Sequence, residues 1–287
     1  MNRVAATTIA VGLVAVALAT GCARTAKLSA AEIVAKNVAA RGGLDAWRKV
    51  ETMVWIGHVE SAHTPLPSMP FKVEQKRPNK TRLQINALGD KSVRVFDGVQ
   101  GWKLPPARGR PEVQPYTPQE LKFAQAAHGI DGPLIDYAAK GNSVTLESLD
   151  EIGGRRAYHL NVRLAKGGNE DVWVDTKTYL DIRYDRMADG PAGALRRVSA
   201  THGDYRTVEG LQIPFLIETG GRPGTTPDKM QIETVVLNAP LDDSTFENPV
   251  APHPRNRGRP GVAPQAPAPT APSTAPSASE ERGSLNR

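Results

Sequence analysis

Cysteine is almost absent from this chain of 287 residues, which contains only Cys22. One cysteine excludes an internal disulfide and a cysteine-based zinc site, so neither stabilises the fold. Concentrated charge is also scarce. The chain has a net charge of +6. Arg3 is the only charged residue among residues 1–21, and residues 251–287 contain five arginines and two glutamates, a net charge of +3. Residues 22–250 therefore have a net charge of only +2. Binding to several phosphates needs clustered Lys and Arg, so we expect no nucleic-acid partner.

The motifs of common enzyme classes are missing as well. The six histidines show no His-Glu-x-x-His spacing, and neither a Gly-x-Ser-x-Gly elbow nor a Gly-x-x-x-x-Gly-Lys-Ser/Thr phosphate loop occurs. The glycine cluster at residues 220–224 contains Pro223, which favours a surface turn. We therefore expect no enzymatic activity, no metal and no cofactor, although a catalytic site assembled from distant residues stays open.

The N-terminus has the pattern of an export signal. Arg3 precedes an uncharged, mostly apolar stretch over residues 4–20, and Leu18-Ala19-Thr20-Gly21 leads to Cys22. This pattern resembles bacterial lipoprotein signals, in which the chain is cleaved before a cysteine that carries acyl chains. A membrane-spanning anchor is the alternative, but the apolar run is short for a span and no basic cluster follows it. The residue after Cys22 is alanine rather than aspartate, so the resemblance implies anchoring to the outer membrane on its periplasmic face.

The C-terminal segment differs in composition from the rest. Residues 251–287 contain eight prolines with many Ala and Ser, and we expect this tail to be disordered. The predicted organisation is a signal peptide over residues 1–21, an anchor linker over 22–28, one domain over 29–250 and the tail.

The middle of the chain predicts a mainly β fold with a few helices. Ser29-Ala30-Ala31-Glu32 has capping-box spacing and begins a helix that ends at Gly42-Gly43, and Leu44 to Val50 adds a short helix with Trp47 facing inward. Thr117-Pro118 begins another helix that runs to about residue 128. About ten strand patterns occur, at residues 52–59, 71–76, 81–85, 92–96, 144–149, 157–162, 171–174, 179–184, 211–217 and 231–237. Many consecutive strands with few helices favour one large, curved antiparallel sheet covered by helices.

Three segments, in this order, resemble the LolA/LolB family of lipoprotein carriers and receptors of the outer membrane. The first segment, Lys76-Arg77-Pro78-Asn79, is similar to a Lys-Arg-Pro-Asn segment of the carrier. Residues 96–102 are similar to the carrier's Asp-Gly-x-x-x-Trp hairpin. The third segment, Phe246-Glu247-Asn248-Pro249, is similar to the Phe-x-x-Pro strand with which the family ends. The resemblance covers about residues 29–250. It implies an incomplete β-barrel of about 11 strands, with helices as a lid over an apolar cavity for lipoprotein acyl chains.

Strand alternation predicts which residues face the concave side of such a barrel. These are Met53, Trp55, Val59, Phe71, Val73, Leu83, Ile85, Leu160, Val162, Ile182, Ile213, Phe215 and Ile217. Alternation does not distinguish a lined cavity from a filled core, so both interpretations stay open.

The resemblance also suggests individual roles. Arg77 matches the arginine of the carrier's motif, which in that family forms a bond to the lid. The resemblance therefore implies that Arg77 is a lid latch. The alternative is a solvated arginine at the end of a strand. The loop of residues 61–70 contains Leu66 and Met69, which we expect to be exposed, either to touch a membrane or partner or only to pin the loop.

The sequence thus predicts a lipid-anchored periplasmic protein that binds lipid or lipoprotein acyl chains in an apolar cavity, and the membrane through lipidated Cys22. One alternative is a protein-interaction or stress-sensor module with an envelope protein as its partner, as in the RseB-like regulators of similar fold. The other is a structural lipoprotein whose tail contacts the cell wall.

Overall fold

The computed structural model describes residues 27–62, 64, 66, 68–87, 90–106, 112–127, 129–189, 194–220 and 226–249. All of them belong to one compact unit. Cys22, the expected signal peptide and the expected tail lie outside the described residues, so the anchor, the tail and the domain boundaries stay predictions.

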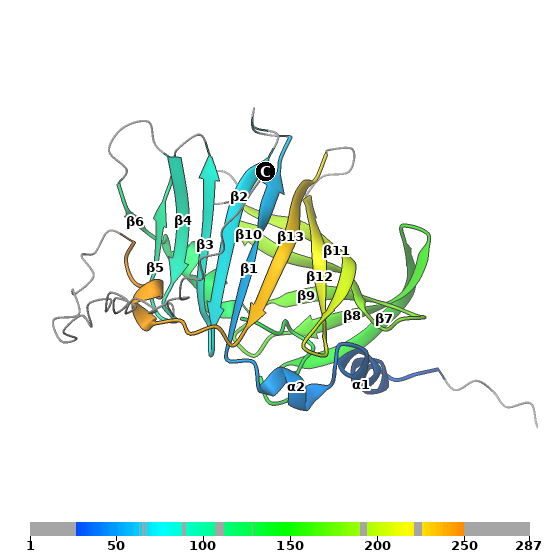
Figure 1. The fold of residues 1–287 in the computed structure, drawn as a ribbon. Helices are drawn as coiled ribbons and strands as arrows, with labels where there is room; N and C mark the ends of the chain where they lie inside the picture. Colours follow the sequence, from blue (N-terminus) through cyan, green and yellow to red (C-terminus); the bar gives the residue numbers. More distant parts are fainter. Residues whose placement is uncertain are drawn as a thin grey trace, which may run out of the picture. The chain divides into compact units, whose positions relative to one another are not determined.

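One antiparallel sheet of 13 strands makes up most of the described chain, in the order β6-β5-β4-β3-β2-β1-β13-β12-β11-β10-β9-β8-β7 (Figure 1). The strands are β1 (Thr52–Glu60), β2 (Met69–Lys76), β3 (Lys80–Ala87), β4 (Asp90–Phe96), β5 (Gly101–Leu104), β6 (Gln114–Pro115), β7 (Ser143–Ile152), β8 (Arg155–Arg163), β9 (Asn169–Asp175), β10 (Asp181–Asp189), β11 (Leu195–Val208), β12 (Leu211–Gly220) and β13 (Asp228–Leu237).

The sheet consists of two meanders that meet in its middle. β1 to β6 form the first meander and β7 to β13 the second, and they are joined where β1 pairs with β13, for example Trp55 with Val235. A β-bulge lies between Ile56 and Gly57 in this pair. A Cβ atom at Gly57 would lie 2.0 Å from the carbonyl oxygen of Gln231, so only glycine fits this close approach of the two strands. The two outer strands, β6 and β7, are not paired with each other, so the sheet curls without closing.

The predicted fold class is confirmed, with three strands more than the alternation patterns indicated. β5 contains only four residues, β6 only two with one proline, and β11 is a polar sequence without clear alternation. The predicted strand at residues 179–184 begins at Asp181 and continues to Asp189. Periodicity is the signal that sequence analysis uses, so strands without it were not found.

The helices lie at one end of the sheet and across its open side. They are α1 (Ala30–Ala40), α2 (Leu44–Arg48) and α3 (Pro118–Ala126), and a 3-10 helix η2 (Asp243–Phe246) follows the last strand. Ser29 forms the predicted capping box of α1, and Thr117, at the predicted start of α3, also forms a capping box. Gly42 follows Arg41, the C-cap of α1; its φ is 111° and an added Cβ would lie 2.6 Å from Gly210 O, so this position requires glycine. The segment after Gly132 is a series of turns.

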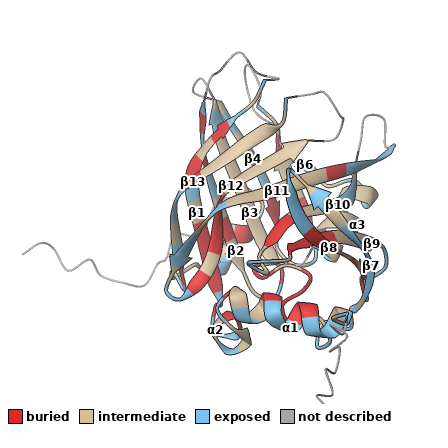
Figure 2. Cartoon of the chain, turned by 90° about the vertical axis from the view of Figure 1, so that its right-hand side faces the viewer, coloured by how far each residue is buried: buried red, intermediate tan, exposed pale blue. Residues whose placement is uncertain are grey.

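The core is concentrated at the end of the sheet that α1 and α2 cover, where buried residues gather in Figure 2. The main cluster joins both meanders: Met53 and Phe71 come from the first, and Ile213, Phe215 and Ile232 from the second. A second cluster lies between α1 and strands β8 and β9. None of the described helices is long and apolar enough to cross a membrane.

Candidate functional site

A cavity of about 850 Å³ lies on the concave side of the sheet and is partly open to solvent. Its apolar wall includes Trp47 of α2, Met53 and Trp55 of β1, Leu83 of β3 and Ile213 of β12. Strands from both meanders therefore face one another across it, with α3 and the turns after residue 128 on the remaining side. Cavities of this size commonly hold small-molecule ligands.

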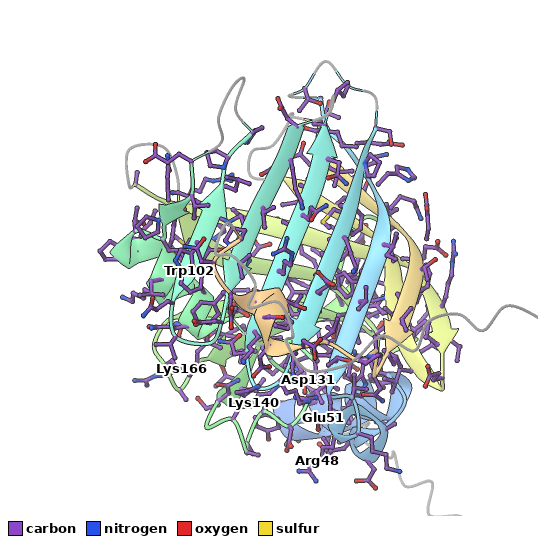
Figure 3. The ribbon with its side chains drawn as sticks, turned by 60° about the vertical axis from the view of Figure 1, so that its left-hand side comes forward. Arg48, Glu51, Trp102, Asp131, Lys140 and Lys166 are labelled. Carbon is purple, nitrogen blue, oxygen red and sulfur yellow. The ribbon has the colours of Figure 1, made fainter. Side chains whose placement is uncertain are left out.

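Arg77 ties the cover of the cavity to the sheet. Its Nε donates a hydrogen bond to Val50 O at 2.6 Å, and its Nη2 donates to Trp47 O at 3.0 Å and to Asp131 Oδ2 at 2.8 Å. Lys140 donates to the other oxygen of the buried Asp131 and to Gly132 O. Figure 3 shows Asp131 and Lys140 close together below the end of the sheet. One carboxylate thus joins the end of β2 to the turns that close the cavity.

α3 closes the open side of the sheet with fewer buried contacts. None of its residues is buried, and Phe123 is the large apolar side chain that it contributes to the cavity lining. Glu120 holds this helix to the first meander through Lys103 at 2.9 Å and Arg94 at 3.0 Å. Burial alone would raise the pKa of Glu120, but these cations and the backbone N–H of Thr117 lower it to about 2.

A buried ion pair forms the polar end of the cavity. Arg41 Nη1 lies 3.1 Å from Asp181 Oδ2, with side chains that are 8% and 2% exposed. Asp181 also accepts hydrogen bonds from Tyr184 OH at 2.6 Å and Asn37 Nδ2 at 2.7 Å, and its carbonyl oxygen accepts one from Tyr205 OH at 2.8 Å. The guanidinium of Arg41 stacks on the ring of Trp47, 4.6 Å from its centroid. α1, α2, β10 and β11 therefore converge at this point.

The surroundings fix the protonation of these groups. Burial opposes the charge of Arg41, but Asp181 raises its pKa. Burial and the same carboxylate raise the pKa values of Tyr184 and Tyr205. Burial lowers the pKa of His202, which stacks against Tyr184, to about 4. At neutral pH the polar end thus holds one ion pair and neutral aromatic groups.

The 13 residues predicted for the concave side have three different environments. Met53, Trp55, Leu83 and Ile213 line the cavity. The others on this side pack with the main core cluster and fill the space beside the cavity; these are Val59, Phe71, Val73, Ile85, Phe215 and Ile217. Leu160 and Val162 lie under α1 in the second cluster. The concave side is therefore filled in one part and open in another.

Three predicted positions need correction. Ile182 packs with Trp173 and Ala157, apart from the cavity, because a β-bulge between Asp181 and Arg183 shifts the alternation of β10. Met69 is only 7% exposed, and Leu66 is partly buried against the main cluster. Their exposure, expected from the loop position, is wrong because β2 begins at Met69 and turns this side chain into the core.

Sequence reasoning missed the polar end and most of the cover. Arg41, Asp181 and His202 are far apart in the chain and belong to no motif. An arginine at the C-terminal end of a helix is common and favourable in itself, so Arg41 gives no local signal of a buried ion pair. Among the described residues, no group of three or more His, Cys, Asp or Glu could hold a metal.

Comparison with known proteins gives a likeness of fold. No protein-family model and no curated protein matches the sequence. A DUF1329 family protein from Desulfovibrio piger is similar in structure, with a TM-score of 0.50 and 13% identity over 76% of this chain and 97% of that chain.

Two further solved structures are similar at slightly lower scores. One is a LolA superfamily protein from Nitrosomonas europaea, with a TM-score of 0.48 and 14% identity over 77% of this chain and 98% of that chain. The other is a domain from Vibrio parahaemolyticus whose name assigns it to outer membrane lipoprotein sorting, with a TM-score of 0.47 and 11% identity over 75% and 94%. At these identities, the likeness to all three structures is one of fold.

Proposed function

We propose that this protein binds lipid or the acyl chains of lipoproteins in the cavity on the concave side of its sheet. The observation that carries the proposal is a space of about 850 Å³ whose lining presents the partly exposed Trp55, Leu83 and Phe123, with the buried Trp47, Met53 and Ile213 behind them. Neighbouring concave positions are filled by side chains of the core, so the open part is a distinct space. The proposed role is binding and transfer rather than catalysis.

The cover of this cavity is suited to opening. α3 has no buried residue and is held chiefly by ionic contacts of Glu120, whereas α1 is anchored by the fully buried Ile33 and Val34. Arg77 acts as the latch on the other side of the cover through its contact with Asp131. A ligand would enter where α3 meets β10.

The proposed location is the periplasmic face of the outer membrane. The support is the lipoprotein-like sequence that ends at Cys22, followed by alanine. Two or three acyl chains on this cysteine would give lasting attachment, because each buried methylene contributes roughly 0.8 kcal/mol.

Native mass spectrometry tests the binding proposal. The chain from residue 22 to 287 with Cys22→Ser keeps every described residue and is purified without detergent. We expect a bound mass that disappears on denaturation and is identified as lipid. Reproducible absence of lipid, together with no binding of a fluorescent acyl probe, would refute the proposal.

A pair of tryptophan variants links any bound mass to the cavity. Leu83→Trp places a large ring in the cavity wall and should abolish binding, while Val236→Trp changes an exposed strand position, 42% exposed, and should not. Equal binding by both variants would place the lipid elsewhere on the protein.

A protein-interaction role of the RseB-like kind is the second candidate. It is favoured by the part of the concave side that Val59, Phe71 and Phe215 fill with their own side chains. Capture of an envelope protein that is unaffected by Leu83→Trp, with no lipid bound to the unmodified domain, would support this role instead.

A further inference from the structure

The polar end of the cavity contains an arginine with one unused edge. Arg41 is the C-cap of α1 and is 6% exposed as a residue. Its Nη1 contacts Asp181 Oδ2 at 3.1 Å and donates to Asp131 O at 3.3 Å. Nε and Nη2 have no hydrogen-bond partner among the described residues, and Nε is fully buried. The contacts therefore occupy one nitrogen and leave the Nε–Nη2 edge free.

A free guanidinium edge has a specific chemical preference. Its N–H groups only donate, and two parallel donors match the two oxygens of a carboxylate or phosphate. A buried N–H group without a hydrogen-bond partner is energetically unfavourable. A ligand oxygen that accepts a hydrogen bond from this edge would therefore stabilise the complex. Stacking on Trp47 covers one face of the guanidinium and leaves its edges to make hydrogen bonds in the plane.

The other cations of the described lining and cover do not offer such an edge. Arg94 and Lys103 are engaged with Glu120. Arg186 lines the cavity but is exposed, so water screens its charge. Arg41 is thus the buried cation of the cavity lining that is best placed to select an anion.

Two further nitrogen atoms occur in the same lining. Trp55 Nε1 and His202 Nδ1 are buried, and neither has a hydrogen-bond partner among the described residues. Trp55 Nε1 is a donor, and His202 Nδ1 donates or accepts according to the tautomer of the neutral ring. Unpaired polar nitrogens beside an apolar lining that includes Leu83 and Phe123 are the arrangement that an amphiphile requires, with a polar head at one end and a chain along the other.

We propose that the cavity takes a single-chain amphiphile with an anionic oxygen head group, which pairs with the Nε–Nη2 edge of Arg41 while its alkyl chain lies along the partly exposed Trp55, Leu83 and Phe123. This inference rests on the proposed function and narrows its ligand from acyl chains in general to amphiphiles with a carboxylate or phosphate head. Movement of the Arg41 side chain within the cavity brings the edge to the ligand.

Isothermal titration with matched 16-carbon ligands tests the inference on the residue 22–287 chain with Cys22→Ser. We expect hexadecanoate or hexadecyl phosphate to bind roughly ten- to hundredfold more tightly than hexadecanol, the range given by charge-assisted hydrogen bonds. Tighter binding of one anion over the other identifies the head group. Equal affinity for hexadecanol overturns the inference and leaves the proposed function intact, whereas no binding of any chain refutes both.

A matched pair of arginine variants locates the effect. Arg41→Lys keeps a positive charge near Asp181 but lacks the forked edge, and it should reduce the preference for anion over alcohol to less than about threefold. Arg186→Gln removes an exposed cation of the same cavity and should leave the preference unchanged. The opposite result, loss in Arg186→Gln and retention in Arg41→Lys, would assign the selection to the cavity entrance and overturn the inference. The hexadecanol affinity of each variant reports whether its cavity is intact.

Discussion

Asp131 shows how one buried carboxylate organises the cover of the cavity. Arg77 binds one of its oxygens and Lys140 the other, while Arg41 donates to its backbone carbonyl. Burial lowers the pKa of Lys140, and Asp131 opposes this by stabilising the charged form. Removing either partner would leave a buried charge with incomplete compensation, which is more costly than the loss of an exposed pair.

Arg77→Ala should therefore destabilise the protein far more than a similar exposed change. We expect the free energy of unfolding in urea to fall by about 3 kcal/mol, since Asp131 is only 3% exposed and loses one of two cations. Arg48→Ala is the matched control, because Arg48 bonds Asp136 of the same turns but is 54% exposed, and it should cost less than about 1 kcal/mol. Similar losses in both variants would show that Arg77 is not a latch.

His202 gives the protein a predicted sensitivity to mild acid. Its pKa is about 4 in the folded protein and 6.5 ordinarily, so as pH falls the unfolded chain binds the proton first and the folded state loses stability. Between pH 7 and pH 5 this loss should be about 2 kcal/mol. Glu120, with its lowered pKa, contributes only below pH 4.5.

The control for this pH dependence is His202→Gln, which does not titrate. Urea unfolding at pH 7 and pH 5 should show a fall in stability for the unmodified protein that exceeds the fall for the variant by about 2 kcal/mol. The same fall in both proteins would mean that other groups produce the acid sensitivity.

At the scale of elements, α1 and α3 have the same type of N-terminal cap but differ in how far they pack into the core. Ser29 and Thr117 each form a capping box, yet α1 buries Ile33 and Val34 while α3 buries none of its residues. Because tertiary packing provides most helix stability in proteins, α3 should depend on its cap more than α1 does.

Hydrogen exchange of the two helices tests this difference. Thr117→Ala removes a cap contribution of about 1 kcal/mol and should speed exchange of the α3 amides roughly fivefold. Ser29→Ala removes the equivalent contact from α1, where the packed face should limit the change in the later turns. Equal acceleration along both helices would contradict the view of α3 as the mobile part of the cover.

The elements also show what the sequence could and could not predict. Both capped helices and most strands were found because capping boxes and alternation are local signals. β11 was missed because its polar sequence depends on pairing with β10 and β12, and Ile182 was misplaced because a bulge leaves no local signal. The ion pair of Arg41 and Asp181 was missed for the same reason, since 139 residues lie between its members and only the fold brings them together.

At the scale of the whole described domain, the two meanders share one core. Each is a continuous half of the chain, and the contact between them consists of the β1–β13 pair and the cluster that contains Met53, Phe71, Ile213 and Phe215. Neither half could bury these side chains alone. The two meanders should therefore unfold together, although the described domain exceeds the size at which two-state behaviour is usual.

Hydrogen exchange by mass spectrometry at increasing urea concentrations tests this cooperation between the meanders. Peptides from β3, in the first meander, and from β8, in the second, should lose protection at the same urea midpoint, because the two meanders share the main core cluster and line the cavity together. A ligand bound only to the folded state at a hundred times its Kd should raise both midpoints together, by about 2.7 kcal/mol in unfolding free energy. If the urea midpoints of the β3 and β8 peptides differed by more than the measurement error, the cavity would lie between two independently stable halves. Opening by separation of the meanders would then replace opening by α3.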